Sequence, residues 1–251
     1  MIDVHTHLLP GVDDGSPSVA VSVPILEQFA TDGVETVVCT PHLDASRARE
    51  APFDAHLAIL ESLREAAPKT PVLLPGWEIM LDTPGVDLRD RRLALGGSTA
   101  VLVEFPRMMV PPHAADELFR LRMTGVVPVL AHPERYWGCT TERVEQWRGV
   151  GAVIQMDVAG LFGSGPQSSL AATLLERGLV DLFASDTHGD GRSLVPAKRW
   201  LEELGAQEQA DLLTRRNAAH VLNNEPTEPV PPVERRRGML GRLKELLLGR
   251  R

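Results

Sequence analysis

The sequence is poor in the residues and motifs that would assign it to several common protein classes. It contains only two cysteines, Cys39 and Cys139, among 251 residues, which argues against a disulfide-stabilised secreted protein. No apolar run approaches 18 residues, so no segment is predicted to span a membrane. The first residues also lack the basic and then apolar pattern of a secretory signal. We therefore expect a cytoplasmic protein.

Signals for binding nucleotides or nucleic acids are missing as well. No G-x-G-x-x-G or G-x-x-x-x-G-K-[ST] motif follows a predicted strand, so a nucleotide-binding doubly wound fold has no support. The formal net charge of −8 argues against general nucleic-acid binding. Residues 235–251 nevertheless carry a local charge of +6, so the rest of the chain carries −14. An acidic body followed by a basic tail is the main shift in composition.

Apolar runs typical of β-strands alternate with helical patterns along the first 222 residues. The predicted strands are 1–4, 34–40, 71–76, 100–105, 126–132, 152–156 and 180–185, and the predicted helices are 17–32, 53–67, 112–124, 141–149, 167–177 and 195–222. Ser16 before Pro17 predicts a helix cap followed by proline at the first helical position. Alternating β and α segments predict an α/β fold with a parallel sheet, and seven strands favour a barrel over an open sheet.

The remaining residues predict two further regions. Residues 223–234 are rich in proline and glutamate and are typical of a linker. Residues 235–251 form a basic amphipathic pattern with apolar residues on one helical face. This tail is predicted either to contact an anionic membrane surface, to dock on a partner, or to be a solvated terminus.

Six of the seven predicted strands are followed at once by histidine, glutamate or aspartate. In a parallel barrel these strand ends share one face, where active sites are built. A single histidine there would most often be structural, but so many imidazoles and carboxylates on one rim would repel one another without neutralising cations. The residues concerned are His5, His7, His42, Glu78, Glu104, His132, Asp186 and His188.

These residue types predict a metal site with more than one ion. Imidazole and carboxylate ligands without cysteine suit zinc, manganese or iron. His5 and His7 are separated by one residue, so on an extended strand both side chains point the same way and can bind one ion. Asp14 in the following turn brings the number of ligands to nine, enough for two or three ions bridged by a carboxylate. The neighbouring Asp13 is equally compatible with a capping or turn role.

At these residues the sequence resembles the PHP superfamily (polymerase and histidinol phosphatase), and more closely its bacterial tyrosine-protein phosphatases of capsular and exopolysaccharide synthesis. The matching motifs cover about residues 1–222 and read IDVHTHLLPGVDDGS, TPH, GWEI, EFP, AHPERY and ASDTHGDGR. The resemblance implies that residues 1–222 form a metal-dependent phosphatase domain, a distorted seven-stranded (β/α)7 barrel with three metal ions, most commonly manganese. Zinc and iron are the alternatives.

The resemblance also implies a role for each polar residue at the rim. It assigns His5, His7, Glu78 and Asp186 to the first metal, with Glu78 bridging to a second metal that Glu104 and His132 complete. Asp14, His42 and His188 hold the third metal. Arg135 corresponds to the phosphate-binding arginine of the family, and Arg192 to a second arginine, in a loop one residue shorter than usual. Asp157 stands where an asparagine is usual, and its role is open.

The implied activity is hydrolysis of phosphotyrosine by a metal-activated water, with Arg135 adding hydrogen bonds to the phosphoryl oxygens. The implied substrate is a phosphotyrosine protein, specifically a bacterial tyrosine kinase that regulates polysaccharide synthesis, at the inner face of the membrane. A cysteine-based phosphatase needs an arginine six positions after the cysteine. Ala45 and Glu145 occupy those positions after Cys39 and Cys139, so that chemistry is excluded and both cysteines are expected to pack as small apolar residues.

Three alternatives remain open at this point. Histidinol-phosphate phosphatase, or another small phosphate-ester hydrolase of the same superfamily, is the main alternative substrate assignment. A metal-dependent amidohydrolase also begins with a His-x-His strand. Many of these enzymes bridge their metals with a carbamylated lysine at a strand end, and Lys69, Lys198 and Lys244 occupy no such position. A non-catalytic regulator tethered to the membrane by its basic tail is the alternative from another functional class.

Overall fold

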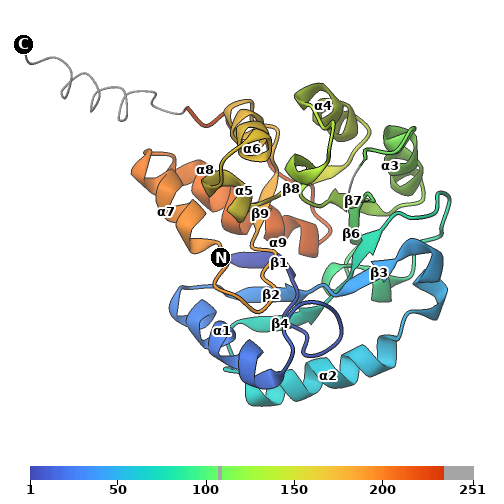
Figure 1. Ribbon diagram of the computed structural model, residues 1–251, viewed down its shortest axis with the longest axis vertical. Helices are drawn as coiled ribbons and strands as arrows, with labels where there is room; N and C mark the ends of the chain where they lie inside the picture. Colours follow the sequence, from blue (N-terminus) through green and yellow to red (C-terminus); the bar gives the residue numbers. More distant parts are fainter. Residues whose placement is uncertain (107–108, 235–251) are drawn as a thin grey trace, which may run out of the picture.

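We describe residues 1–106 and 109–234 of a computed structural model of the protein, in which strands alternate with helices (Figure 1). The strands are β1 (Ile2–Thr6), β2 (Thr36–Cys39), β3 (His42–Asp44), β4 (Val72–Pro75), β5 (Glu78–Met80), β6 (Ala100–Glu104), β7 (Val127–Leu130), β8 (Val153–Asp157) and β9 (Leu182–Ala184). The α-helices are α1 (Val19–Thr31), α2 (Phe53–Ala66), α3 (Ala114–Met123), α4 (Thr141–Gly149), α5 (Val158–Phe162), α6 (Pro166–Glu176), α7 (Val195–Glu203), α8 (Gln207–Asp211) and α9 (Asn217–Leu222). Single helical turns also occur, including η1 (Ala45–Glu50), η4 (Pro133–Arg135) and the π-helical turn η5 (Leu212–Arg216).

All strand pairs in the two sheets are parallel. One sheet has the order β1-β2-β4, and the other has the order β3-β5-β6-β7-β8-β9. β3 begins three residues after β2 ends, and β5 begins three residues after β4 ends. An isolated parallel bridge between Thr6 and Thr187 joins the end of β1 to the chain just after β9. The predicted α/β class with parallel strands is therefore confirmed.

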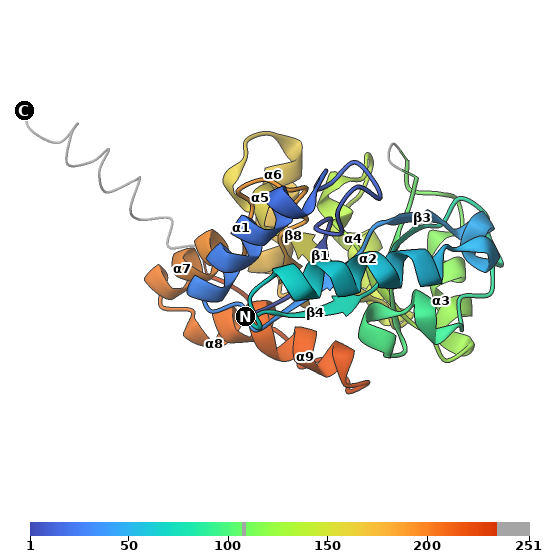
Figure 2. The ribbon, with the colours of Figure 1, turned by 90° about the horizontal axis from the view of Figure 1, so that it is seen from below.

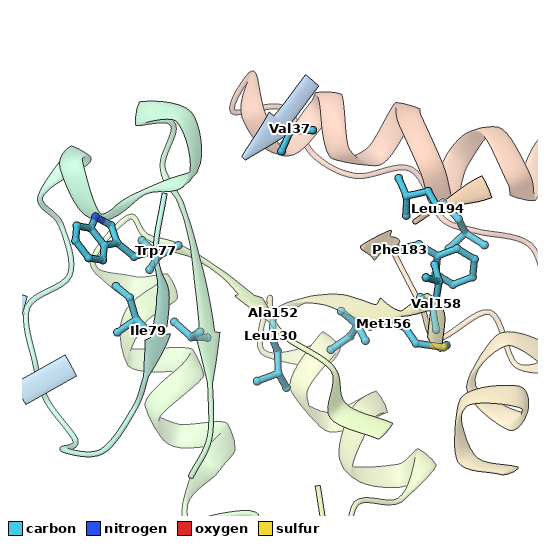
Figure 3. Packing of buried hydrophobic residues seen from close by; sticks show 14 of the residues in the cluster. Val37, Trp77, Ile79, Leu130, Ala152, Met156, Val158, Phe183 and Leu194 are labelled. Atoms are coloured by element: carbon cyan, nitrogen blue, oxygen red, sulfur yellow. The ribbon is translucent and has the colours of Figure 1, made fainter. Parts of the chain in front are cut away.

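Helices surround the strands, and the apolar core fills the space between them. Figure 1 shows α1 and α2 on one side of the strands, with α3, α4 and α6 on the other, and Figure 2 shows α2 crossing in front of the strands. β2, β6 and β7 are mostly apolar because both faces of these strands are covered. Figure 3 shows this packing for Ile79, Leu130, Met156 and Phe183, all of which are fully buried. Burial of each such side chain stabilises the fold by roughly 1.5–3 kcal/mol.

Two local predictions differ from the structure. Ser16 does not cap the first helix, which begins at Val19 with Ser18 as the N-cap residue. The hydroxyl of Ser16 instead lies 2.7 Å from that of Ser22 and donates to the carbonyl of Ser18. The predicted helix over 195–222 is divided into α7, α8, η5 and α9, because Gly205 adopts a left-handed φ of 80° that ends the first helix.

Residues 226–233, within the predicted linker, lie against the body of the protein. Val230 and Val233 are buried in the main core cluster. Asn217 of α9 pairs with the backbone of Glu228 through both its amide nitrogen and its carbonyl oxygen. The backbone nitrogen of Val233 donates to the carbonyl of Leu175. The predicted basic tail, 235–251, lies outside the described residues.

The described helices are too short or too polar to cross a bilayer.

Candidate metal centre

Nine polar side chains meet where the strands end. Seven come from the carboxyl ends of β1, β6, β7 and β9 or from the chain just after them, and two begin short strands that start three residues after β2 and β4 end. His5 lies in β1, His42 and Glu78 begin the short strands β3 and β5, and Glu104 ends β6. The remaining five follow strand ends: His7 and Asp14 after β1, His132 after β7, and Asp186 and His188 after β9. The structure therefore brings together all nine residues that the sequence predicts as metal ligands.

Glu78 lies at the centre of this cluster. Its side chain is 2% exposed, and its carboxylate lies 2.8 Å from Nε2 of His132 and 2.9 Å from Nδ1 of His42. The same carboxylate lies 3.3 Å from Nε2 of both His5 and His7. One carboxylate shared by four imidazoles has the position that a ligand bridging two cations requires.

The donor atoms fall into four overlapping sets. Within each set, one donor atom from every residue lies within 4.8 Å of the others, which is compact enough to surround one ion. The sets are His7, Asp14, His42 and His188; His5, Glu78 and His132; His5, His7 and Asp186; and His42, Glu78 and Glu104. Because the sets share members, neighbouring ions in this cluster would be linked by common ligands.

The electrostatics of the cluster favour positive charge in a buried place. Burial alone would lower the pKa of His5, but Glu78 and Asp186 outweigh it and raise that pKa to about 9. Burial also disfavours charge on His7, yet hydrogen bonds to Asp13, Asp186 and Glu78 raise its pKa to about 11. The pKa of Glu78 is held well below its usual range, because His5 and the other imidazoles outweigh its burial. A divalent cation supplies the same positive charge, so the donor set fits one.

Two of these residues have strained backbones. His132 has φ 34° and Asp186 has φ 49°, in the left-handed region that residues with a side chain rarely adopt. Such conformations cost of order 1–3 kcal/mol and concentrate at functional sites. The strain directs the side chains of His132 and Asp186 back into the cluster, toward Glu78 and His5 respectively.

Arg135 and Arg192 both reach Asp186 from outside the cluster. Nη1 of Arg135 donates to Asp186 at 2.7 Å and to Asp157 at 3.0 Å. Arg192 lies 3.4 Å from Asp186 and 2.9 Å from Nδ1 of His188. Although burial opposes its charge, Arg135 has a raised pKa because Asp157 and Asp186 face it. Two guanidinium groups therefore border the cluster on one side, in place to bind an anion held there.

Several supporting residues could not be assigned from the sequence. Asp13 accepts from Nδ1 of His7 at 2.7 Å, and Gln155 lies 3.2 Å from Nδ1 of His5. Each contact fixes an imidazole so that its Nε2 faces the cluster. Asp157, whose role was open, pairs with Arg135 and also accepts from Gln155. The alternation of Gln155 and Asp157 along β8 was the one available signal, because residues two apart share a face of a strand.

Glu134 is a further buried acid behind the arginine. Its carboxylate accepts from the backbone nitrogen of Asp157 at 3.0 Å. Burial, with the nearby charge of Asp157, raises the pKa of Glu134 to about 8. Glu134 therefore supports the backbone that carries Asp157.

The turn after β1 requires glycine. A Cβ atom at Gly15 would lie 2.3 Å from the carbonyl oxygen of His7, which is too close for any residue with a side chain. This close approach lets the turn return to β1, where the backbone nitrogen of Ser16 donates to the same carbonyl at 2.8 Å. The tight turn places Asp13 beside His7 and Asp14 within 3.2 Å of His42.

The two cysteines are free, and both have weakly acidic thiols. Burial raises the pKa of Cys39 and that of Cys139 to about 12, so neither forms a thiolate nucleophile near neutral pH. Cys39 is fully buried in the core, as expected of a small apolar residue.

Comparison with known proteins identifies the relatives of this chain. Residues 1–223 match the family described as capsular polysaccharide synthesis, CpsB/CapC. Tyrosine-protein phosphatase YwqE of Bacillus subtilis (strain 168) is 30% identical over 251 residues, covering 94% of this chain and 98% of that protein. Tyrosine-protein phosphatase CpsB of Streptococcus agalactiae serotype V is 27% identical, covering 89% of this chain and 99% of that protein.

A solved structure matches as well. It is described among the crystal structures of YwqE from Bacillus subtilis and CpsB from Streptococcus pneumoniae, metal-dependent tyrosine phosphatases. The two chains superpose with a TM-score of 0.76 at 29% sequence identity, covering 94% of this chain and all of the other.

Proposed function

The chain belongs to the capsular polysaccharide synthesis family CpsB/CapC, and we propose that it hydrolyses phosphotyrosine in proteins with the help of divalent cations. The observation that carries this proposal is the convergence of nine imidazole and carboxylate side chains into four overlapping donor sets. The names of the relatives, tyrosine-protein phosphatases described as metal-dependent, support the substrate and the need for metal.

The proposed ligand sets are those that the family resemblance implies. His5, His7, Glu78 and Asp186 would hold a first ion, and Glu78 would also serve a second ion together with Glu104 and His132. Asp14, His42 and His188 would hold a third. The overlapping donor sets of the cluster support this assignment. We take Mn²⁺ as the first choice because it is the metal that the family resemblance implies. Zn²⁺ and Fe²⁺ are the alternatives, since imidazole and carboxylate ligands without a thiolate suit all three metals. Bound divalent cations would lower the pKa of water toward neutrality and offset charge on phosphoryl oxygens.

We assign the binding of the phosphoryl group to Arg135 and Arg192. Their guanidinium groups meet at Asp186 beside the donor sets, so both can donate hydrogen bonds to a phosphoryl group held over the cluster. A planar guanidinium can bind two oxygens at once and fixes their direction. Asp157 holds Arg135 in place from the other side. In this arrangement the arginines orient the phosphoryl group and stabilise the charge that develops during its transfer.

The proposal also covers the closure of the barrel, the domain boundaries and the partners of the protein. The bridge between Thr6 and Thr187 supports a closed seven-stranded barrel, with β2 and β3 forming one strand position and β4 and β5 another. Residues 1–222 would then be the phosphatase domain, residues 223–234 a connecting segment and residues 235–251 a basic tail. The family's link to capsular polysaccharide synthesis supports a tyrosine kinase of that process as the substrate. Contact of the tail with the membrane surface stays a prediction.

The test is a substrate panel with metal-depleted protein to which single metals are restored. The panel contains a phosphotyrosyl peptide, the matched phosphoseryl peptide and histidinol phosphate. We expect Mn²⁺ to restore hydrolysis of the phosphotyrosyl peptide at a rate at least tenfold above the other two. Faster hydrolysis of histidinol phosphate would assign the alternative phosphatase activity. No turnover of any substrate with any metal would favour a non-catalytic regulator.

A further inference from the structure

A pocket of about 230 Å³ lies beside the metal centre. Its lining includes His42, a member of two of the donor sets, together with Val12, Leu43, Pro52, His56 and Trp77. His42 thus belongs to both the cluster and the pocket. A group bound in the pocket would therefore be a direct neighbour of a group bound at the cluster.

The aromatic wall of the pocket is held rigidly. Trp77 is 3% exposed, and its indole nitrogen donates to the carbonyl of Arg92 at 3.0 Å. The ring of His56 stacks on Trp77 with centroids 4.6 Å apart and planes 20° apart. Phe53 meets Trp77 edge-on at 6.0 Å, and Arg92 lies over the ring of Phe53 at 4.1 Å. A wall fixed by these contacts is preorganised for a flat ligand.

The interior of the pocket favours a neutral ligand, while its rim is polar. Burial lowers the pKa of His56, so its imidazole is neutral near pH 7. Val12, Leu43 and Pro52 add apolar surface. Asp44, Arg47 and Glu50 also line the pocket, and the last two are exposed residues of η1 with opposite charges.

His56 also borders a second cavity. This neighbouring space of about 130 Å³ is mostly apolar and is lined by His56 and Trp77 together with Leu9, Leu60 and Pro75. The stacked pair of His56 and Trp77 is common to both spaces. Truncating His56 is therefore expected to enlarge the pocket toward the second cavity.

We propose that this pocket binds the phenyl ring of phosphotyrosine while the phosphoryl group lies at the metal centre. This inference rests on the function proposed above and adds the part of the site that distinguishes tyrosine from serine. A phenyl ring fills the aromatic and apolar interior, whereas the short side chain of phosphoserine leaves it empty. The ring is held through His56 and Trp77, and the phosphoryl group is oriented by Arg135 and Arg192.

The first experiment narrows the pocket from its rim. Glu50→Trp changes an exposed residue outside the metal centre, and Glu65→Trp, at an exposed position on α2 away from the pocket, is the matched control. Binding to Mn²⁺-loaded protein is measured by calorimetry with two probes, inorganic phosphate and phenylphosphonate. We expect Glu50→Trp to weaken phenylphosphonate about tenfold and to leave phosphate within twofold, with Glu65→Trp changing neither. Equal phenylphosphonate affinity in both variants would overturn the proposal.

The second experiment enlarges the pocket and should act in the opposite direction. In His56→Ala, the affinity for 1-naphthylphosphonate relative to phenylphosphonate is expected to rise at least fivefold, since the larger ring can extend toward the second cavity. An unchanged ratio would overturn the assignment. Because both probes share the phosphonate group, a general loss of metal or stability cancels in the ratio.

The failure of this inference is distinguishable from failure of the proposed function. If the wild-type protein hydrolyses phosphotyrosyl peptide but Glu50→Trp and Glu65→Trp bind phenylphosphonate equally, only the ring pocket is wrong. If Mn²⁺-loaded wild-type protein neither hydrolyses any phosphate ester nor binds phosphate, the proposed function is wrong.

Discussion

Buried polar groups have different surroundings at the two ends of the parallel strands. At the amino ends, the buried side chains of Asp181 and Asn217 have their own protein partners. Asp181, just before β9, accepts from Arg148 at 2.8 Å and from the backbone nitrogen of Ile154 at 2.8 Å. Asn217 donates to the carbonyls of Asp181 and Glu228 and accepts from the backbone nitrogen of Glu228. These contacts are complete in the protein alone, which is what stability requires.

At the carboxyl ends, ionisable groups instead crowd around one another. Four imidazoles share the carboxylate of Glu78, and within the described residues Nδ1 of His132 is buried without a hydrogen-bond partner. Such an arrangement is costly unless a further component balances the charge. From this contrast we infer that the amino ends serve the fold and the carboxyl ends serve a ligand, a division also found in (β/α)8 barrel enzymes. Substitutions at the two ends should therefore have separable effects.

The largest effect is expected from His5→Ala at the carboxyl end. Loss of an imidazole shared by two donor sets should reduce turnover of a phosphotyrosyl peptide by about 1,000-fold, equivalent to about 4 kcal/mol. Circular dichroism should retain the helical signal. His113→Ala is the control, since His113 is exposed on the surface, where its imidazole pairs with Asp116. Wild-type turnover in His5→Ala would contradict the role of the cluster.

Asp13→Asn should have an intermediate effect. Asparagine has nearly the same shape but removes the charge that orients His7, and changes to such supporting residues typically cost 10–100-fold in metal affinity or activity. Metal titration of the depleted protein measures the change. Asp116→Asn provides a matched control, because Asp116 also contacts an imidazole, that of His113 at 3.0 Å, outside the metal centre. Identical metal affinity in both variants would remove Asp13 from the site.

Asn217→Ala tests the amino end, where stability rather than activity should change. Removing three hydrogen bonds and leaving their buried partners unsatisfied should cost about 2 kcal/mol, or about 6 °C in melting temperature. Turnover at 25 °C should stay within about twofold of wild type. A variant with unchanged melting temperature and lost activity would show that Asn217 serves activity rather than stability, which would contradict the role given to the amino ends.

The smallest effect is expected from modifying the cysteines. With the pKa of both thiols raised to about 12, fewer than about one thiol in 10,000 is ionised at pH 7.5, and ionisation increases only as the pH rises toward 12. Iodoacetamide at pH 7.5 should therefore leave turnover unchanged over an hour. Rapid inactivation that follows alkylation of Cys39 or Cys139 would indicate a thiol in the reaction.

The metal ligands could be predicted from the sequence more completely than the residues that hold these ligands in place. Period-two spacing placed His5 and His7 on one side of a strand, and parallel strand ends gather on one face whatever the loops do. The contacts of Asp13 and Gln155 with these histidines join residues whose meeting depends on the tertiary turn at Gly15 and on the position of β8. No local pattern carries that information.

The secondary-structure predictions also fail where the tertiary fold, rather than a local sequence pattern, decides the outcome. All seven predicted strands occur, but β3 and β5 were missed because three residues are too few for a period to be visible. Ser16 had the residue type of a helix cap, yet its hydroxyl is used by Ser18 and Ser22. The continuous helix expected over 195–222 ends at the left-handed Gly205, since the amphipathic pattern alone does not show where a chain must turn.

The most direct test of the account is an anomalous-scattering map from crystals of the protein grown with Mn²⁺. We expect three peaks among the nine ligand side chains, with Glu78 next to two of them. A map with no peak among these side chains, from protein that hydrolyses phosphotyrosyl peptide, would contradict it.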